Sequence, residues 1–220
     1  GFSVLGGQTR CPCGPFDCSG SSSGSGVAVA ANLAAVAVGS ETLGSIVAPS
    51  AANAVVGLKV SMGLISRDHI IPLIDWMDVP GPMGRTVTDV AVLLGAMTGA
   101  DNNDLATRVL AGMDPADYTQ YLDTRRTAGM RVGIADMDEA AIEALAAKWA
   151  VWMEDPIDTL RSEIRRDEAR MQEQAKTLAA LGIEMVKIPP AAIPPEPPYT
   201  QVIDYAFRDA LNRFLLGLGD

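Results

Sequence analysis

The sequence is poor in histidine, cysteine and aromatic residues, and each shortage excludes a class of protein. Its 220 residues include one histidine, three cysteines and 5% aromatic side chains. Cys11, Cys13 and Cys18 are odd in number and crowded together, unlike the framework of a secreted disulfide-rich protein, so we expect a reducing, cytoplasmic location. Their C-x-C-x4-C spacing, with His69 as the one further soft ligand, matches no familiar zinc pattern, so no metal is expected.

Acidic residues outnumber basic residues, and the sequence has no long hydrophobic run. The chain carries 17 Lys and Arg against 27 Asp and Glu, a formal net charge of −10 with a sequence pI near 4.5. Its longest apolar stretch, residues 27–38, is interrupted by Asn32 and is shorter than the roughly 20 residues that cross a bilayer. We therefore expect no nucleic-acid partner and no membrane partner, and a small or neutral substrate instead.

Small and aliphatic residues are abundant by contrast. Hydrophobic residues make up 48% of the chain, which has a mean hydropathy of +0.17, as is typical of close-packed helix and sheet layers. The residue pattern predicts helices over 27–38, 85–99, 138–181 with a break at Pro156, and 199–216. It predicts strands over 55–60, 63–66, 130–135 and 184–188, and a proline-rich connector over 189–198. Strands that alternate with helices indicate an α/β fold.

Residues 20–24 match G-x-S-x-G, the nucleophile elbow of α/β-hydrolases. An elbow follows a buried strand, but residues 11–18 contain two prolines and cannot form a central strand. The triad would also have to use His69, the single histidine, with its acid earlier in the chain. We therefore disfavour this motif and expect His69 to be a loop residue.

Two serine-rich loops are the strongest chemical signal in the chain. Ser21 lies in the first loop and Ser45 in the second, 24 residues later. The helix expected between them, residues 27–38, can bring the two loops side by side. The alternative for both serines is a structural role as a helix cap or turn residue.

Four motifs, in this order, resemble the amidase signature family of serine hydrolases. They are SGSSSGS at residues 19–25, GSETLGSI at 39–46, GLK at 57–59 and GPMGRTVTD at 81–89. The resemblance implies the amidase-signature α/β fold, a mixed β-sheet core covered by helices on both faces. It further implies that residues 1–135 form the signature core and that residues 136–220 continue the same domain as a helical, proline-rich part. Because the N- and C-terminal parts of the family's domain have no counterpart here, we expect an internal segment of a longer amidase.

The resemblance also implies roles for individual residues. Ser45 occupies the position of the acyl-accepting nucleophile, and Ser21 that of a bridging serine held in a cis peptide. Backbone N–H groups of Thr42, Leu43 and Gly44 would form the oxyanion hole and bind substrate. The family's base is a lysine well upstream of Ser21, so the resemblance implies a lysine outside this segment; Lys59 belongs to the GLK motif, which the family uses structurally.

Four positions depart from the family's usual pattern. Glu41 stands where the family has aspartate, and Val47 where it often has arginine. Ser23 and Leu43 stand where the family usually has glycine, and the change at Ser23 is mild. Leu43 is expected to reshape the acyl pocket, and Val47 removes a cation that often supports the bridging serine. We interpret these changes as those of a subfamily and not of an inactive enzyme.

The resemblance implies a hydrolase that cleaves linear amides, or esters or carbamates, through an acyl-enzyme on Ser45. It implies a small-molecule substrate and no metal or organic cofactor, and it leaves a homodimer open. Two alternatives are a glutamine-dependent amidotransferase A-type subunit, which would need partner subunits, and a catalytically incomplete structural chain.

The sequence also predicts roles for five other residues near the motifs. Asp78, Arg85 and Asp89 are expected to hold the fold, with an ion-paired helix start as one form of this role. Trp76 and Met77 precede the fourth motif, where they either line a substrate channel or simply pack.

Overall fold

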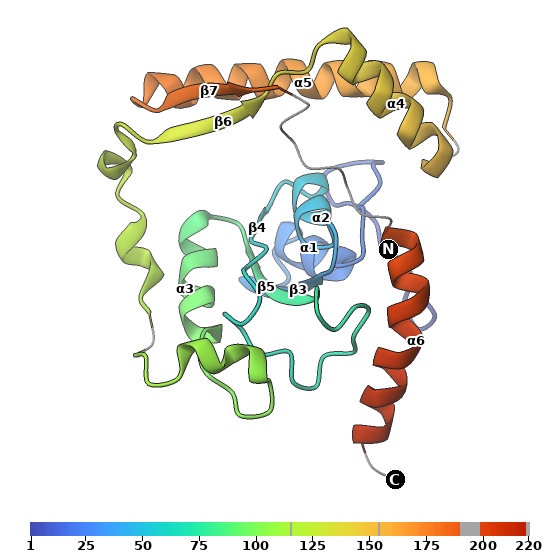
Figure 1. Ribbon diagram of the computed structural model, residues 1–220, viewed down its shortest axis with the longest axis vertical. Coiled ribbons are helices and arrows are strands. Elements are labelled where there is room, and N and C mark those ends of the chain that lie inside the picture. The colour runs from blue at the N-terminus through green and yellow to red at the C-terminus, as the bar shows by residue number, and fades with distance from the viewer. Residues whose placement is uncertain (115, 154, 190–198, 219–220) are drawn as a thin grey trace. The chain divides into compact units, whose positions relative to one another are not determined.

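The computed structural model describes residues 1–114, 116–153, 155–189 and 199–218, which form two compact units (Figure 1). The serine unit comprises Gly1–Leu122 with Pro198–Asp220, and the second unit comprises Asp123–Pro197. Both units combine helices with paired strands, which confirms the predicted α/β class. The predicted division of the sequence at residue 135 stays a prediction.

A three-stranded antiparallel sheet lies at the centre of the serine unit. Its order is β3 (Val36–Glu41), β5 (Val79–Gly84) and β4 (Val56–Gly57). Strands β3 and β5 pair over six residues, from Val36 opposite Gly84 to Glu41 opposite Val79. The unit also contains the strand pair β1 (Phe2–Ser3) and β2 (Gly7–Gln8), the helices α1 (Ser23–Ala30), α2 (Val47–Ala52), α3 (Val87–Met97) and α6 (Tyr199–Gly217), and the 3-10 helices η1 (Leu105–Leu110) and η2 (Tyr118–Tyr121).

The prediction of one helix over residues 27–38 is wrong. Helix α1 begins earlier, at Ser23, and ends at Ala30, and strand β3 takes the second half of the stretch. Asn32 separates the two elements with a left-handed φ of 59°, a conformation that asparagine tolerates better than most residues. Beyond it, alternate β-branched residues, Val36 and Val38, favour the strand. The two serine loops are therefore connected by a helix and a strand.

The central strand, β5, has no counterpart among the predicted strands because it contains Pro80 and Pro82. The N–H of Leu58 donates to the carbonyl of Pro82 at 3.1 Å, so the proline nitrogens face the β4 side, where the partner strand has only two residues. Gly81 permits this close approach, since a Cβ there would meet the carbonyl oxygen of Leu58. The predicted strand 55–60 is correspondingly reduced to β4.

Helix α3 confirms the helix predicted over 85–99, with both ends slightly inside that range. A reciprocal capping box between Thr86 and Asp89 starts it. Its inner face packs on the sheet in a cluster of buried residues: Val60, Ile65, Val79 and Leu94. Ile65 forms a single bridge to Thr98, so the strand predicted over 63–66 is present only as that bridge.

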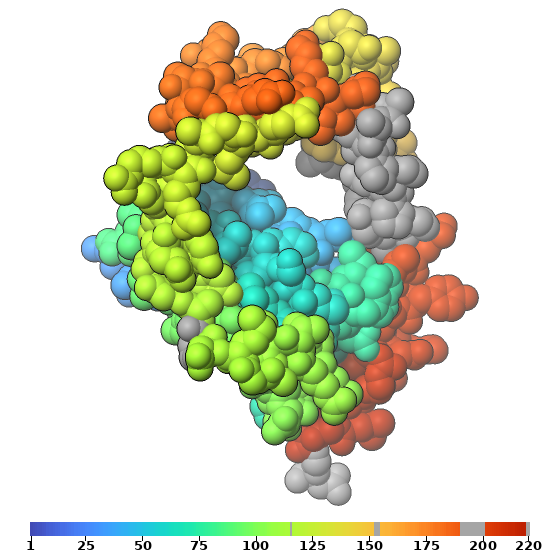
Figure 2. All heavy atoms as spheres, turned by 60° about the vertical axis from the view of Figure 1, so that its left-hand side comes forward, coloured from blue at the N-terminus to red at the C-terminus, as the bar shows by residue number. Residues whose placement is uncertain are grey.

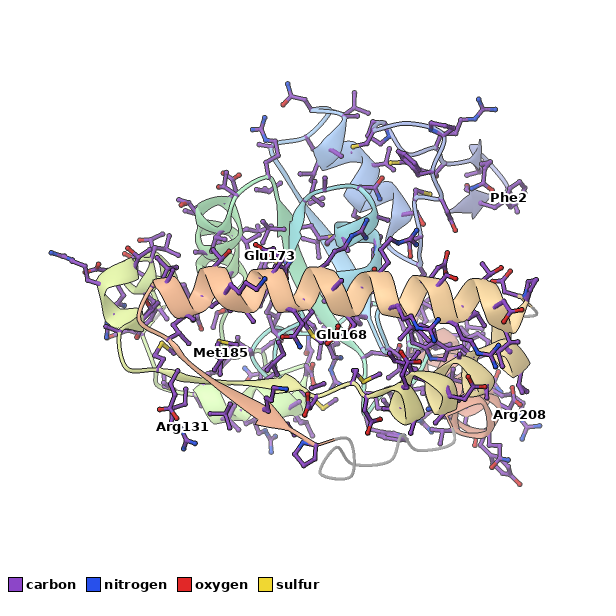
Figure 3. The ribbon with its side chains drawn as sticks, turned by 90° about the horizontal axis from the view of Figure 1, so that it is seen from above. Phe2, Arg131, Glu168, Glu173, Met185 and Arg208 are labelled. Atoms are coloured by element: carbon purple, nitrogen blue, oxygen red, sulfur yellow. The ribbon has the colours of Figure 1, made fainter. Side chains whose placement is uncertain are left out.

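The second unit follows its predictions closely. Strands β6 (Arg131–Ala135) and β7 (Glu184–Ile188) pair in parallel, and their atoms lie against each other in Figure 2. The helical stretch is divided at Pro156 into α4 (Glu139–Met153) and α5 (Ile157–Ala180). The unit also contains the 3-10 helix η3 (Thr124–Thr127), which precedes β6. Their shared core contains Ile142, Ala146, Leu160 and Ile164. The long helix α5 also carries polar residues such as Glu168 and Glu173 (Figure 3).

Two further predictions concern the C-terminal part. Helix α6 confirms the helix predicted over 199–216, and the guanidinium of Arg213 pairs with the carboxylate of Asp75 within the serine unit. The predicted proline-rich connector lies outside the described residues apart from Pro189. Among the helices of the described residues, none combines the length and the apolar character that crossing a membrane requires.

Candidate active site

The first serine loop leads directly into helix α1. The Gly20–Ser21 peptide bond is cis, which confirms the geometry expected for Ser21. Ser19 before it has a positive φ of 57°, and its carbonyl accepts a hydrogen bond from the Ser23 hydroxyl in the first turn of α1. Ser21 is exposed, and its hydroxyl makes no hydrogen bond to a described residue. The loop thus presents this hydroxyl outward from a backbone that is fixed on both sides.

Ser22 joins the first loop to strand β3 and to the second loop. It is the N-cap residue of α1, yet its hydroxyl does not cap the helix. Instead the hydroxyl donates to the carbonyl of Ser40 and accepts from the Ser40 N–H, each at 3.1 Å. The Ser22 N–H donates to the carbonyl of Ser45, also at 3.1 Å. Gly39 leaves room for this contact, because a Cβ there would lie 2.8 Å from the Ser22 hydroxyl oxygen.

The second serine loop, residues 42–45, connects β3 to α2. Gly44 has a φ of 78°, which glycine adopts without strain, and Ser45 is half-buried at the end of the turn. The N–H groups of all four loop residues, Thr42, Leu43, Gly44 and Ser45, donate to no residue that the structure describes. Four successive unpaired N–H groups beside a serine hydroxyl, which include those of the predicted oxyanion residues Thr42, Leu43 and Gly44, are suited to bind an oxyanion.

Two buried carboxylates hold this loop from inside the unit. One oxygen of Glu41, Oε2, accepts the N–H groups of Ile46 at 2.7 Å and Val47 at 3.0 Å. Asp78 accepts the Thr42 hydroxyl through one oxygen, and through the other it accepts two backbone N–H groups of the segment before it. From the outer side, the Lys59 ammonium donates to the Thr42 carbonyl at 3.3 Å.

A small pocket of about 70 Å³ opens beside these groups. Its polar wall includes Ser21, Ser45 and Thr42, and its apolar wall includes Ile70, Ile71 and Leu73. The fold thus brings the two predicted catalytic serines together, although no described histidine lines the pocket. Leu43 is 40% exposed and is not part of the lining, so its expected effect on the acyl pocket stays a prediction.

Hydrogen bonds of Arg67 hold the segment that forms the apolar wall of the pocket. The guanidinium of Arg67 donates twice to the carboxylate of Asp104, at 2.8 and 2.7 Å, and once to the carbonyl of Asp75. These hydrogen bonds lower the pKa of Asp104 to about 2, and the same pairing raises the pKa of Arg67. Arg67 therefore ties the segment that follows it to the start of η1. Sequence reasoning did not single out this pair, since 37 residues separate its members.

A family model described as Amidase matches residues 2–217. The chain belongs to the amidase signature family. A putative amidase of Schizosaccharomyces pombe is 43% identical over 138 residues, which cover 61% of this chain and 24% of that protein. The A-type component of a glutamyl-tRNA(Gln) amidotransferase from Synechococcus elongatus is 44% identical over 115 residues, which cover 52% of this chain and 23% of that protein. The predicted family is confirmed, and the matched residues span about a quarter of the length of these relatives.

Solved structures agree with this assignment. The native peptide amidase of Stenotrophomonas maltophilia superposes with a TM-score of 0.80 at 36% sequence identity. The match covers 99% of this chain and 40% of that one. The amidase-signature fold predicted from the four motifs is therefore confirmed.

The other residues for which the sequence predicted a role in this amidase-family chain lie outside the serine pocket. Asp89 caps α3, and the Arg85 guanidinium donates to the Asn32 side chain at 2.6 Å, so both hold the fold as predicted, although Arg85 bonds an amide and not an acid. Trp76 is exposed and Met77 is half-buried, and neither lines this pocket or the larger one beside Arg67, so the choice between channel lining and packing stays a prediction. His69 is a loop residue, as predicted, with its side chain 80% exposed near Asp68.

The cysteines do not line the serine pocket. The thiols of Cys11 and Cys18 are buried and donate to the backbone carbonyls of Ala52 and Thr9, while Cys13 is exposed. Within the described part of the chain, no three His, Cys, Asp or Glu side chains are grouped so that they could hold a metal ion. These contacts give the two buried thiols a packing role.

Proposed function

We propose that this chain carries the nucleophile and the proton relay of a hydrolase that cleaves amide bonds through an acyl-enzyme on Ser45. One observation carries the proposal: Ser21 and Ser45 line the same pocket, beside a loop whose N–H groups have no partner among the described residues. The family and the similarity to a peptide amidase structure support amides as the substrate class. Esters and carbamates are further candidates, because the same oxyanion chemistry serves all three.

In the proposed reaction, the Ser45 hydroxyl oxygen attacks the substrate carbonyl carbon. Its proton passes to the Ser21 oxygen as the Ser21 proton passes to a neutral lysine. The carbonyl oxygen becomes an oxyanion that accepts the N–H groups of the loop 42–45. When the tetrahedral intermediate collapses, the lysine returns its proton through Ser21 to the leaving nitrogen, and water then hydrolyses the acyl group from Ser45.

We assign the base to a lysine outside these 220 residues. Lys59 is the one lysine of the serine unit, and its ammonium donates to the carbonyl of Thr42 behind the loop. Lys59 does not line the pocket that contains Ser21 and Ser45. A structural role for Lys59 agrees with this contact.

A fluorophosphonate probe tests the proposal in the protein at its full encoded length. We expect the probe to modify Ser45, identified by peptide mass spectrometry, and to block hydrolysis of a p-nitroanilide. Ser45→Ala should abolish both labelling and turnover. Ser61→Ala is a matched control, because Ser61 is an exposed loop serine whose hydroxyl makes no hydrogen bond to a described residue. Turnover that survives Ser45→Ala would contradict the proposal.

The second candidate is the A-type subunit of a glutamine-dependent amidotransferase. The relative from Synechococcus elongatus favours it, since that protein is named as such a component. The same acyl-Ser45 chemistry would then release ammonia from glutamine for use by the partner subunits. Glutaminase activity that appears only with partner subunits would distinguish this candidate from a free-standing amidase.

A further inference from the structure

Glu41 is a buried acid at the end of strand β3, directly before the loop that carries Ser45. Its side chain is 3% exposed, and its backbone is held in the sheet opposite Val79. A buried carboxylate is costly unless it is hydrogen-bonded. Its partners are the N–H groups of Ile46 and Val47, which follow Ser45 immediately.

These two N–H groups belong to the start of α2, where the sequence supplies no local cap. The N-cap residue is Ile46, which makes no side-chain capping bond, and the first turn contains no acidic residue. Helix α3 shows the usual alternative, since Thr86 and Asp89 cap it from within its own first turn. Glu41 instead reaches across the whole loop, over five and six residues, and thereby closes residues 41–47 into a ring.

This ring determines which backbone donors remain for a substrate. Glu41 accepts the N–H groups of Ile46 and Val47, whereas those of Thr42, Leu43, Gly44 and Ser45 have no partner among the described residues. A loop free to relax could turn these donors toward its own carbonyls or toward the start of α2. Preorganised donors stabilise an oxyanion because they need no reorganisation during the reaction.

We propose that Glu41 is a positioning residue for the reaction of Ser45: its carboxylate fixes residues 42–45 so that their N–H groups face the developing oxyanion. The inference rests on the proposed function of Ser45. Glu41 itself does not exchange a proton with the substrate. Its effect is on the geometry of the oxyanion loop, and therefore on kcat more than on KM.

Two substitutions at Glu41 separate the acceptor from its charge. Glu41→Gln keeps an oxygen at the same distance but loses the charge that strengthens both hydrogen bonds, so kcat should fall about 10-fold. Glu41→Met keeps the length and removes the acceptor, so kcat should fall about 100-fold, as when an oxyanion donor is lost. KM should stay within about twofold in both variants. Each kcat is expressed per serine titrated with the fluorophosphonate, so that misfolded protein does not enter the comparison.

Asp89→Asn is the matched control, because Asp89 also caps a helix with its carboxylate but starts α3 and lines no part of the serine pocket. We expect a lower unfolding temperature with unchanged kcat per titrated serine. The proposal is overturned if Glu41→Gln keeps the kcat of the wild type, or if Asp89→Asn loses as much. If Glu41→Met does not fold, Glu41→Gln alone decides. Ser45→Ala is measured in parallel: turnover in that variant contradicts the role of Ser45, whereas wild-type kcat at Glu41→Gln contradicts only the positioning role.

Discussion

The backbone N–H of Ser22 donates to the carbonyl oxygen of Ser45 at 3.1 Å. This hydrogen bond joins the two serine loops directly, next to the cis peptide that precedes Ser21. The Ser22 hydroxyl adds two bonds to Ser40, at the end of the strand that leads into the second loop. A residue between the predicted catalytic positions thus holds both loops in register.

Ser22→Ala should weaken this junction. We expect a loss of about 1–2 kcal/mol in the free energy of unfolding, since two hydrogen bonds to Ser40 are removed. Amide hydrolysis should fall about 10-fold as the loops lose their register. Ser25→Ala provides the comparison, because its hydroxyl donates to the Val38 carbonyl at 2.7 Å, farther from the serine loops. Urea unfolding and kcat are measured for both, and equal kcat losses would contradict the special role of Ser22.

Gly39→Ala should destabilise the protein through the same contact. The added Cβ would lie 2.8 Å from the Ser22 hydroxyl oxygen and 3.0 Å from the Met83 sulfur. Overpacking of this kind costs about 1–3 kcal/mol. Gly99→Ala should have little effect, since nothing lies within 4 Å of a Cβ there. Because Ser22→Ala removes one clashing atom, the double variant Gly39→Ala with Ser22→Ala should lose less stability than the two single losses combined, which a double-mutant cycle measures.

Thr42→Val should reduce turnover by removing the hydroxyl that Asp78 accepts. Asp78 is 7% exposed and would lose one of its three donors, while the loop would lose one of the two buried carboxylates that hold it. We expect a fall of about 10–100-fold in kcat, in the range of a disturbed oxyanion hole. Thr42→Ser retains the hydroxyl and should recover most of this loss. Equal kcat for the valine and serine variants would show that the hydroxyl bond has no effect.

Stability should fall in acid because of Asp104. The Arg67 hydrogen bonds lower its folded pKa from the ordinary 3.8 to about 2, so the unfolded chain binds the proton more readily between these values. The stabilisation is complete above the unfolded pKa and is lost as the pH falls toward 2. Between about pH 5 and pH 2 the loss amounts to about 2 kcal/mol. Urea unfolding at both pH values should show this loss in the wild type, and Asp104→Asn should lack it.

Periodicity in the sequence predicted the second unit well, because its elements are long or locally determined. Residues 131–135 and 184–188 are strands, and Pro156 breaks the helical stretch between them. The same reasoning failed at β5, where two prolines argue against a central strand. The prolines are tolerated because their nitrogens, which lack an N–H, face strand β4, and β4 has only two residues. The order of the strands in the sheet cannot be read from the local sequence.

By itself the sequence determined the family, since four motifs of small residues in a fixed order are specific where composition is not, and it predicted Ser21 and Ser45 as the candidate catalytic serines. The tertiary structure shows why glycine stands at positions 39 and 81, where a Cβ would meet the Ser22 hydroxyl and the Leu58 carbonyl oxygen. Only the tertiary structure decided what holds the serine loops. Ser22 and Asp78 bond residues of distant segments, which depends on how the chain folds and not on residue type alone. Glu41 reaches across its own loop to the start of α2, which depends on the conformation of that loop.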